Sequence, residues 1–395
     1  MGDNFFLLLI LLVFVAIGLH EDFVLTLVYF FVGVYAVGRW WSHRALNAVH
    51  FTRTFPKRAF LNEKVPLTLE IINTGWLPVI WAQIAESLPV ELIVPNSFQR
   101  VVSLGPHGRA HFTFTLNADK RGYYLIGPLH LRSGDLIGLA EDTQNEGRAD
   151  NLIVYPRIIP LAHVPLPSHS PLGTLRHTQP IFEDPTRVRG KRDYVAGDSL
   201  RRVDWKATAS TGRLQVKQFE PSIALETAIV LNLNADEYDY RTRYDATELA
   251  IVVAASLANW IVGRRQSVGL WVNGEDPLNG KNQPSAILPR KGRAHLTRLL
   301  DVLARVRSIK TQSLVDQLRQ TVPRLSWGTT LIVITGSLDE AVFDEIFRAR
   351  RAGLDVLVAL MGLVPDRVAV VQRARHFGMP LYEFARERDL DMWRK

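Results

Sequence analysis

Oxygen-bearing side chains stand at the ends of two expected strands, in a pattern that could hold a cation. Asn232, Asn234 and Asp236 lie in and after an apolar strand over 228–234, and Thr335 ends another strand. In an open α/β sheet, ligands bind outside the carboxyl ends of the strands. A hard divalent cation prefers anionic oxygen ligands, whereas this first loop offers two amides and one carboxylate. These side chains are a weak set of ligands for such an ion, so we expect no metal and no other cofactor.

Other patterns of catalytic chemistry fit poorly. Gly274–Lys281 resembles a phosphate-binding loop, but it has five residues between its glycines, and Asn282 stands where a Ser or Thr would hold magnesium. His107 and His111 have the spacing of zinc ligands on a helix, yet they adjoin Gly108 and lead into an expected strand. The chain has no cysteine, no G-x-S-x-G elbow and no H-E-x-x-H motif. The sequence therefore predicts a protein that is not an enzyme.

The basic segment Arg187–Glu220 joins the two halves of the chain and holds nine Lys and Arg against four Asp and Glu. We expect Asp198 to cap a short helix over Ser199–Ala209, followed by a strand over Arg213–Phe219. Trp205 would face inward from that helix. The candidate residues for a partner or interdomain contact are Arg192, Asp193, Tyr194, Gly197, Asp198, Arg201, Arg202, Asp204, Trp205, Lys206 and Lys217.

Two interpretations of this basic segment stay open. In the first, its Lys and Arg side chains pair with Asp198, Asp204 and Glu220 and lock the flanking domains together. In the second, they dock an acidic partner or anionic lipid headgroups. Nucleic acid is disfavoured, because exposed stacking aromatics in a recognisable binding module are missing.

The N-terminal part of the chain has the pattern of a membrane anchor. Residues 5–19 and 23–38 are uncharged apolar runs with a polar turn at 20–22. Flanking residues extend each run toward the roughly 20 residues that a bilayer requires. We interpret residues 1–45 as a transmembrane helical hairpin. A signal peptide fits less well, because an acidic residue stands in its n-region and no cleavage site follows. A buried helical hairpin of a soluble domain is the remaining alternative.

Basic residues indicate the orientation of this hairpin. Arg39, Arg44, Arg53, Lys57 and Arg58 all follow the second run, and no Lys or Arg precedes it. By the positive-inside rule, that side is cytoplasmic. We therefore expect a two-pass plasma-membrane protein with the bulk of the chain in the cytoplasm. The net charge of +8 is compatible with an anionic membrane surface or an acidic partner.

The rest of the chain divides by pattern into three parts and a tail. Alternating apolar residues and frequent Pro and Gly over 46–155 predict a β-sandwich of immunoglobulin-like type. Residues 156–222 form a connector that includes the basic segment. Strands alternate with helices over 223–385, which predicts a doubly wound parallel sheet. Residues 386–395 are a tail.

The order of elements over 223–385 resembles that of a von Willebrand A-type domain. That fold often holds a metal-ion-dependent adhesion site, with Asp-x-Ser-x-Ser in the first loop and an Asp after a later strand. This chain has Gly336 where the later Asp is expected. The resemblance thus implies the fold, while the departures imply that the metal site is lost.

The segment RDYVAGDSLRRVDWKATASTGRLQVKQFE (192–220) closely resembles the signature of a bacterial membrane protein family of unknown function. That family accompanies MoxR-type AAA+ ATPases. The segments KRGYYLIGP (120–128) and SGDLIGLAE (133–141) fit its upstream β domain, and the likeness runs from about Arg53 to Phe384. Ser210 departs from the signature, where an Arg is expected.

The resemblance implies a membrane-anchored scaffold or adaptor that works with a MoxR-type AAA+ ATPase in a cell-envelope or complex-assembly process. Membrane lipid is the other expected partner, and nucleic acid is not expected. A metal-dependent adhesion or receptor protein with a von Willebrand A domain is the alternative, and an uncharacterised hydrolase is a third.

Overall fold

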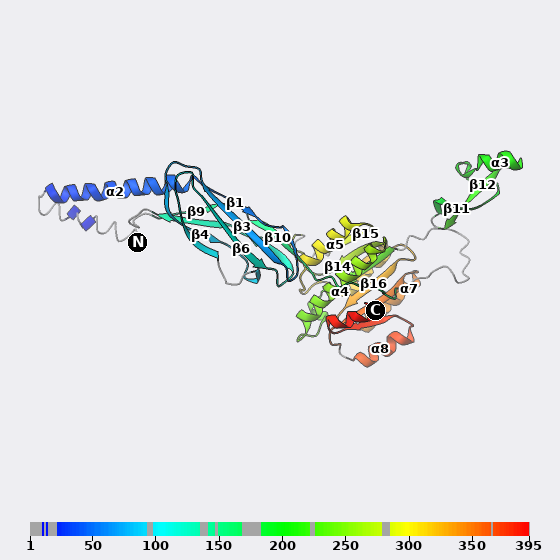
Figure 1. Cartoon of the computed structure of the whole chain (residues 1–395). Coiled ribbons are helices and arrows are strands. Elements are labelled where there is room, and N and C mark those ends of the chain that lie inside the picture. Colours follow the sequence, from blue (N-terminus) through cyan, green and yellow to red (C-terminus); the bar gives the residue numbers. More distant parts are fainter. Residues whose placement is uncertain are drawn as a thin grey trace. The chain divides into compact units, whose positions relative to one another are not determined.

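The computed structural model describes residues 10–11, 13–14, 22–92, 98–134, 141–146, 149–167, 183–221, 226–278, 285–364 and 366–394 (Figure 1). The chain divides into two compact units: Met1–Arg157 with Leu300–Arg305, and Ile158–Leu299 with Val306–Lys395. The first unit contains an apolar helix and a β domain, and the second contains a β-hairpin and an α/β domain.

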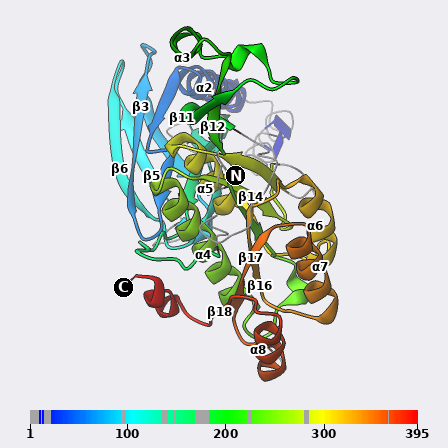
Figure 2. The same ribbon diagram turned by 90° about the vertical axis from the view of Figure 1, so that its right-hand side faces the viewer.

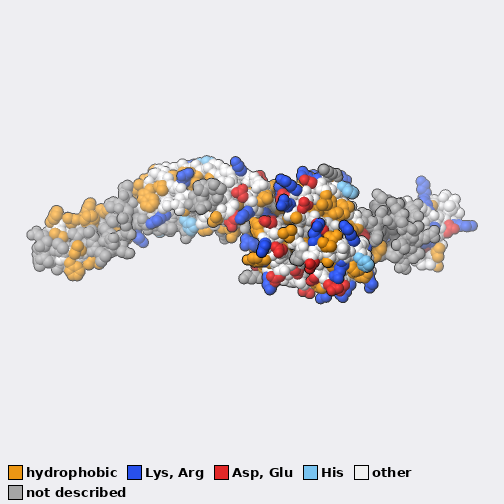
Figure 3. All heavy atoms as spheres, turned by 90° about the horizontal axis from the view of Figure 1, so that it is seen from below, with side chains coloured by type: hydrophobic (Ala, Val, Ile, Leu, Met, Phe, Trp, Pro, Cys, Tyr) orange, Lys and Arg blue, Asp and Glu red, His pale blue; other side chains and the backbone are white. Residues whose placement is uncertain are grey.

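Helix α2, Asp22–Leu46, carries the second expected apolar run. Its stretch Phe23–Leu46 is long and apolar enough to span a membrane, and only 6% of its most apolar window is buried. Hydrophobic side chains lie exposed along it (Figure 3). Helix α4, Arg243–Gly263, passes the same test, but 83% of its window is buried, as in a core helix. The first apolar run and the polar turn lie largely outside the described residues, so the two-pass hairpin stays a prediction.

The β domain consists of three sheets, with the orders β1-β3-β6, β2-β10-β7 and β5-β4-β8-β9. Its strands are β1 (Val49–Thr54), β2 (Arg58–Phe60), β3 (Lys64–Asn73), β4 (Val79–Glu86), β5 (Phe98–Leu104), β6 (Arg109–Asn117), β7 (Gly122–Ile126), β8 (Leu129–Gly134), β9 (Glu141–Glu146) and β10 (Asp150–Tyr155). A short 3-10 helix, η1 (Val90–Leu92), follows β4.

Strand β3 shows how the sequence builds this domain. Val65, Leu67, Leu69 and Ile71 alternate along it, and each is at most 1% exposed. Leu69 and Ile71 pack with side chains of β4 and β8, whereas Val65 and Leu67 pack with those of β7 and β10. Sheet β1-β3-β6 therefore covers both of the other sheets, and the expected two-layer β domain is present.

The register of β3 defines two ends of the β domain. Asn73 pairs with Val49, where the chain arrives from α2. Lys64 begins β3 at the other end, nine residues away, which is about 30 Å at roughly 3.3 Å per residue. The chain also leaves the domain at that second end, because Tyr155 pairs with Phe60 just before the turn into β3.

The α/β domain is a six-stranded sheet with the order β15-β14-β13-β16-β17-β18, in which β15 alone is antiparallel to its neighbour. Its strands are β13 (Glu226–Leu231), β14 (Ser267–Val272), β15 (Ser285–Arg290), β16 (Thr330–Thr335), β17 (Asp355–Met361) and β18 (Leu381–Phe384). Besides α4, its helices are α6 (Leu314–Thr321), α7 (Glu340–Arg351), α8 (Arg367–His376) and the first part of α5 (Arg293–Arg305), whose residues from Leu300 on are assigned to the first unit. Short 3-10 turns are η3 (Ala235–Glu237), η4 (Val322–Arg324) and η5 (Glu387–Trp393).

Helices cover both faces of this sheet (Figure 2). Helices α6, α7 and α8 pack their apolar side chains on one face, and α4 contacts the strands from the other. Every residue of β14, β16 and β17 is buried, which explains their continuous apolar sequences. The expected alternation of strands and helices is confirmed. Strand β15 was missed, because an edge strand with alternating burial carries no continuous apolar run.

Parts of the expected connector and tail also belong to the α/β domain. Ile159 N–H donates to Ser256 Oγ on α4 (2.9 Å). Ala162 N–H donates to the carbonyl of Trp393 (2.8 Å). Trp393, from the expected tail, is 1% exposed and lies with its ring centroid 4.8 Å from that of Phe384. The residues after the last strand are therefore part of the core.

Candidate functional site

A closed set of polar side chains lies at the carboxyl ends of β13, β14 and β16. Asn232, directly after β13, donates to Thr335 Oγ1 at the end of β16 (2.9 Å). Asn273, directly after β14, donates to Asn232 Oδ1 (2.7 Å) and accepts from Leu233 N–H (2.6 Å). Asn232, Thr335 and Asn273 are at most 2% exposed. These hydrogen bonds tie three strands together where the strand order reverses.

Glu237, in η3, completes this polar set. Its carboxylate accepts from Asn232 Nδ2 (2.6 Å), Asn234 Nδ2 (3.0 Å) and Leu314 N–H (3.0 Å). Leu314 is the first residue of α6, so the carboxylate lies at the positive end of that helix. The negative charge at this sheet edge is therefore already compensated by protein groups.

Asp236, the only carboxylate among the expected ligands, is turned outward. It pairs with Lys310 (2.9 Å), and 53% of its side chain and 82% of that of Lys310 are exposed. The structure thus brings Asn232, Asn234 and Thr335 together and leaves Asp236 apart.

Tyr238 occupies the space beside Gly336. A Cβ at Gly336 would lie 2.3 Å from Tyr238 Cδ1, so a side chain cannot fit there while the ring is in place. The Tyr238 hydroxyl donates to the Asn232 carbonyl (2.6 Å). Burial, and then the charge of Glu237, raise the pKa of Tyr238, so the phenol stays protonated. The ring therefore fills the space that a side chain at position 336 would occupy.

Sequence reasoning missed Glu237 and Asn273. Asn273 directly follows a strand, which is the signal that selected Asn232, and Glu237 lies in the same loop as Asp236. Within the described residues, no group of three or more His, Cys, Asp or Glu is placed to hold a metal ion. The polar set joins strands and caps a helix, and its amide oxygens are already hydrogen-bonded.

The basic segment forms a β-hairpin, with β11 (Glu183–Asp193) antiparallel to β12 (Gln215–Pro221). The 3-10 turn η2 (Leu200–Arg202) and helix α3 (Trp205–Thr211) lie between the strands. We call residues 194–214, which join β11 to β12, the hairpin tip. Tyr194 N–H donates to the Leu214 carbonyl (2.8 Å), which closes the tip at its base.

Asp198 holds the first turn of the hairpin tip. It accepts from both terminal nitrogens of Arg192 (2.7 and 2.6 Å) and from Val195 N–H (3.0 Å). The Arg192 guanidinium, and then the Val195 N–H, hold the pKa of Asp198 below its usual range. Gly197 has φ 109°, a conformation that favours glycine in this turn. The expectation that Asp198 caps a helix is wrong, because its oxygens are engaged with Arg192 on β11.

Asp204 caps the helix instead. It accepts from Ala207 N–H (3.2 Å) and pairs with Lys191 (2.8 Å), and these two contacts, the Lys191 contact first, lower the pKa of Asp204. Lys191 lies directly opposite Lys217 in the antiparallel ladder of β11 and β12, so the Asp204 carboxylate offsets two facing positive charges. Helix α3 consequently begins six residues later than the Ser199 start that the sequence suggested.

Trp205 is 67% exposed, so the expectation that it faces inward is wrong. It is the first residue of α3, in which Ala207 is the buried residue. The inward positions are held by Val203, Ala207 and Val216, which are 6%, 8% and 2% exposed. A two-turn helix offers room for one small inward residue, and Ala207 fills it.

The hairpin tip is both apolar and basic on its surface. Val195 and Leu200 are 61% and 64% exposed, and Arg201, Arg202 and Lys206 are also exposed. Within the described residues, neither Arg201 nor Lys206 takes part in an ion pair. The ion pairs found in this segment join Lys191 to Asp204, Arg192 to Asp198 and Arg213 to Asp193, all inside the hairpin.

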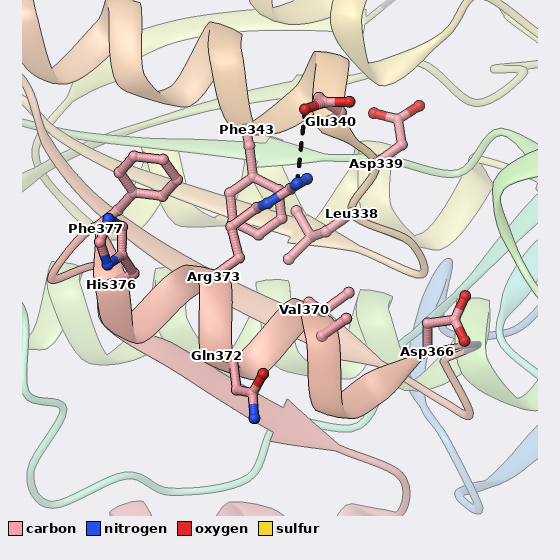
Figure 4. A pocket seen from close by; sticks show the side chains of 11 residues that line it. Leu338, Asp339, Glu340, Phe343, Asp366, Val370, Gln372, Arg373, His376 and Phe377 are labelled. Carbon is pink, nitrogen blue, oxygen red and sulfur yellow. Dashed lines mark ion pairs between the residues drawn. The ribbon is translucent and has the colours of Figure 1, made fainter.

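A groove in the α/β domain lies between α7 and α8 (Figure 4). Phe343 and Val370 line it, and Arg373 on α8 pairs across it with Glu340 on α7 (3.6 Å). This ion pair bridges the two helices, so the groove is explained by the packing of α8 on α7. We assign it no ligand.

Solved structures give a distant likeness in part of the chain. The CARDB domain of a Pyrococcus furiosus protein, solved in complex with di-metal ions, is 16% identical, and the match covers 27% of this chain and 86% of that domain with a TM-score of 0.21. A β-glucosidase from Listeria innocua, in complex with gluconolactone, is 13% identical over 27% of this chain and 16% of that enzyme, with a TM-score of 0.17.

Sequence comparison identifies relatives of unknown function. Residues 190–364 match the model of a family described as "Protein of unknown function DUF58", from within β11 to just beyond β17. The uncharacterized protein YeaD of Bacillus subtilis (strain 168) is 27% identical over 243 residues, which are 61% of this chain and 56% of that protein. The chain thus spans about half the length of this relative. The hairpin tip and the α/β domain as far as residue 364 are therefore similar to a bacterial family whose function is unknown.

Proposed function

We propose that the chain is a membrane-anchored adaptor whose hairpin tip docks a partner protein. The observation that carries the proposal is the exposed Trp205, which shares the hairpin tip with exposed Leu200 and Val195 and with Arg201 and Lys206, two cations that form no ion pair within the described residues. Trp and Arg dominate the energetics of many protein interfaces, and an apolar surface with a basic rim suits an acidic partner. The tip lies within the family-matched region.

The partner that we propose is a MoxR-type AAA+ ATPase acting in a cell-envelope or complex-assembly process. This identity rests on the resemblance of residues 192–220 to the signature of a family that accompanies such ATPases. The alternative is that the basic segment holds the two flanking domains together. It has less support, because the ion pairs found in the hairpin join residues of the hairpin to one another.

A non-enzymatic role is also part of the proposal, and so is a von Willebrand A-like assignment of the α/β domain. The order of its elements supports that assignment. The adhesion-type alternative requires a metal site, and the amides of Asn232 and Asn234 are instead bonded to Glu237. An immunoglobulin-like assignment of the β domain stays a prediction.

The test is capture of the MoxR-type ATPase of the same organism by the full chain in lipid nanodiscs. We expect Trp205→Ala and the double variant Arg201→Ala/Lys206→Ala to lose capture. The loss of capture caused by the double variant, relative to wild type, should be largest at low salt and shrink at high salt, because exposed charges act through screened attraction. Its matched control is Lys291→Ala/Arg293→Ala, which removes the same charge from exposed positions at the start of α5.

The melting curves of these variants separate docking from folding. Exposed side chains without structural partners usually change stability by less than about 0.5 kcal/mol. We therefore expect wild-type melting curves for Arg201→Ala/Lys206→Ala and for Trp205→Ala. Undiminished capture by both variants would contradict the docking role, and early melting of Trp205→Ala would mean that its indole is buried.

A further inference from the structure

Helix α2 runs into the β domain without a hinge. Ala45, Leu46 and Val49 are at most 2% exposed and share one hydrophobic core with side chains of β3, β4 and β8. Trp41, one turn earlier, packs against the same core and donates from Nε1 to the Pro78 carbonyl (3.1 Å). The last turns of α2 are therefore part of the β domain, and the two elements form one body.

The turn between β3 and β4 lies directly against the end of this helix. Thr74 donates to the Ala48 carbonyl from both its backbone N–H (2.8 Å) and its hydroxyl (2.9 Å). A Cβ at Gly75 would lie 2.7 Å from Ala48 Cβ, so glycine permits this close approach. Leu77 anchors the turn at 2% exposed, whereas its neighbour Trp76 is 66% exposed.

Helix geometry places this turn at the level where α2 would leave a bilayer. About 20 helical residues cross the hydrocarbon core, so a helix that enters at Phe23 leaves it near Ser42. The Trp41–Pro78 hydrogen bond lies at that level. Trp76 is two residues from Pro78, a reach of at most about 7 Å. The headgroup layer is roughly 5–8 Å thick on each side of the core, and Trp76 lies within reach of it.

The chemistry of this end of the β domain suits phospholipid headgroups. Indoles concentrate at membrane–water interfaces, where an apolar ring and a polar N–H are both satisfied. Trp40 on α2 is 55% exposed, so two exposed indoles lie near the helix end. Arg39 and Arg44 are also exposed on the same turns of α2, where they can reach lipid phosphates.

We propose that Trp76 is a second membrane contact, which seats the α2 end of the β domain on anionic phospholipid headgroups. Helix α2 alone fixes one point of attachment, and an indole inserted beside it restrains the tilt of the whole domain. The inference rests on the proposed anchoring by α2. It goes beyond that anchoring, since it assigns a surface of the β domain to lipid.

Site-directed spin labelling tests the proposal cleanly, because the chain contains no cysteine. Single-cysteine variants of the full chain carry a nitroxide in nanodiscs of phosphatidylethanolamine and phosphatidylglycerol. Collision with oxygen and with a water-soluble nickel chelate reports depth. Val32→Cys probes the middle of α2, Trp76→Cys probes the turn, and Lys64→Cys probes the opposite end of β3, about 30 Å away at roughly 3.3 Å per residue.

We expect the label at residue 32 to be oxygen-accessible, the label at 76 to read interfacial depth, and the label at 64 to behave as in water. A water-like reading at 76 with residue 32 in lipid would overturn the second contact and leave the anchoring intact. A water-like reading at 32 would overturn the anchoring itself. A label at 76 shielded from both reagents would mean that protein, and not lipid, covers Trp76.

A second measurement places the label on another residue, so that the Trp76 indole can be present. His107 lies in the turn between β5 and β6, and its backbone N–H donates to the Gly75 carbonyl (3.3 Å). A label on His107→Cys should show interfacial depth when Trp76 is present and shift toward the water value in Trp76→Ser. An unchanged depth in Trp76→Ser would overturn the role of the indole. The melting temperature should not move, because Trp76 is largely exposed.

Discussion

Arg53 is the residue whose removal should disturb the β domain most directly. It donates to Glu86 (2.5 Å) and to Asp150 (2.9 Å), and the Arg53 and Glu86 side chains are 2% and 0% exposed. Burial raises the pKa of Glu86, although the nearby Arg53 charge acts to lower it. A buried carboxylate is tolerated here because Arg53 compensates its charge.

We expect Arg53→Met to destabilise the β domain by about 3–5 kcal/mol, the usual effect of removing one partner from a buried ion pair. The control is Arg109→Met. Arg109 lies 3.8 Å from Glu70 with 70% and 39% of the two side chains exposed, so its loss should change stability by less than about 1 kcal/mol. Urea unfolding followed by hydrogen exchange in β3 measures both, and equal effects would contradict the burial argument.

The effect of Arg53→Met should also depend on pH. A carboxyl whose folded pKa lies above its unfolded pKa binds protons more tightly in the folded state, so its contribution to stability falls as pH rises between the two values. Removing Arg53 takes away the largest influence that lowers the pKa of Glu86. The folded pKa of Glu86 should therefore rise in the variant, and the pH range over which stability falls should extend to higher pH. The variant should therefore lie closer to the wild type near pH 4.5 than at pH 8. A pH-independent difference would mean that Glu86 does not titrate in this range.

At the scale of elements, the positions of the strands can be predicted from local sequence, whereas the residue that caps a helix cannot. The alternation in β3 and the continuous apolar runs of β14, β16 and β17 reflect burial on one or both faces, which a single segment reveals. The choice between Asp198 and Asp204 as a helix cap depends on Arg192 and Lys191, which reach them from β11. A local pattern cannot show that pairing, and the error in placing Trp205 follows from it.

The polar set at the sheet edge shows the same contrast between what local sequence predicts and what depends on distant residues. Strand ends predicted the positions of Asn232, Asn234 and Thr335, because parallel strands bring their carboxyl ends to one edge. Which carboxylate turns inward depends on the N-terminus of α6, far along the chain. Glu237 meets Leu314 N–H there, so Asp236 is left in solvent.

These two neighbouring carboxylates offer a matched pair of variants. Glu237→Ala leaves one N–H of the Asn232 amide and the Asn234 amide nitrogen without that acceptor and removes the contact at α6, and each unsatisfied buried group costs about 1–3 kcal/mol. Asp236→Ala removes a solvent-exposed pair and should cost less than about 1 kcal/mol. Thermal denaturation of the full chain should rank them in that order, and the reverse order would mean that the polar set is not structural.

The same geometry predicts that Mg²⁺ and Ca²⁺ do not stabilise the α/β domain. The amide oxygens of the polar set accept protein hydrogen bonds, and Tyr238 fills the space at Gly336. We expect no shift of the thermal midpoint at millimolar concentrations of either ion. A cation at roughly 100 times its dissociation constant would add about 2.7 kcal/mol, which is easily detected. Such a shift would restore the adhesion-type alternative.

At the scale of the whole molecule, α2 and the β domain belong to one unit. The chain arrives from α2 at one end of β3 and leaves the β domain at the other end. Because α2 shares the core of the β domain, the position of α2 in a membrane would fix the position of that domain. The sequence indicated the apolar helix and the strands, but the fusion of their cores depends on contacts such as Trp41 with Pro78.

The last prediction is the topology of the anchor. Arg39 and Arg44 follow the apolar run of α2, so a reporter fused after Lys395 should be cytoplasmic: green fluorescent and without alkaline phosphatase activity. This result alone fits a one-pass or a two-pass anchor, because α2 has the same orientation in both. A reporter fused before Met1 distinguishes them. It should be cytoplasmic if residues 5–19 also cross the membrane, and a phosphatase fused after His20 should then be active. An active phosphatase at Lys395 would contradict the orientation of α2 and remove the proposed cytoplasmic ATPase from reach of the hairpin tip.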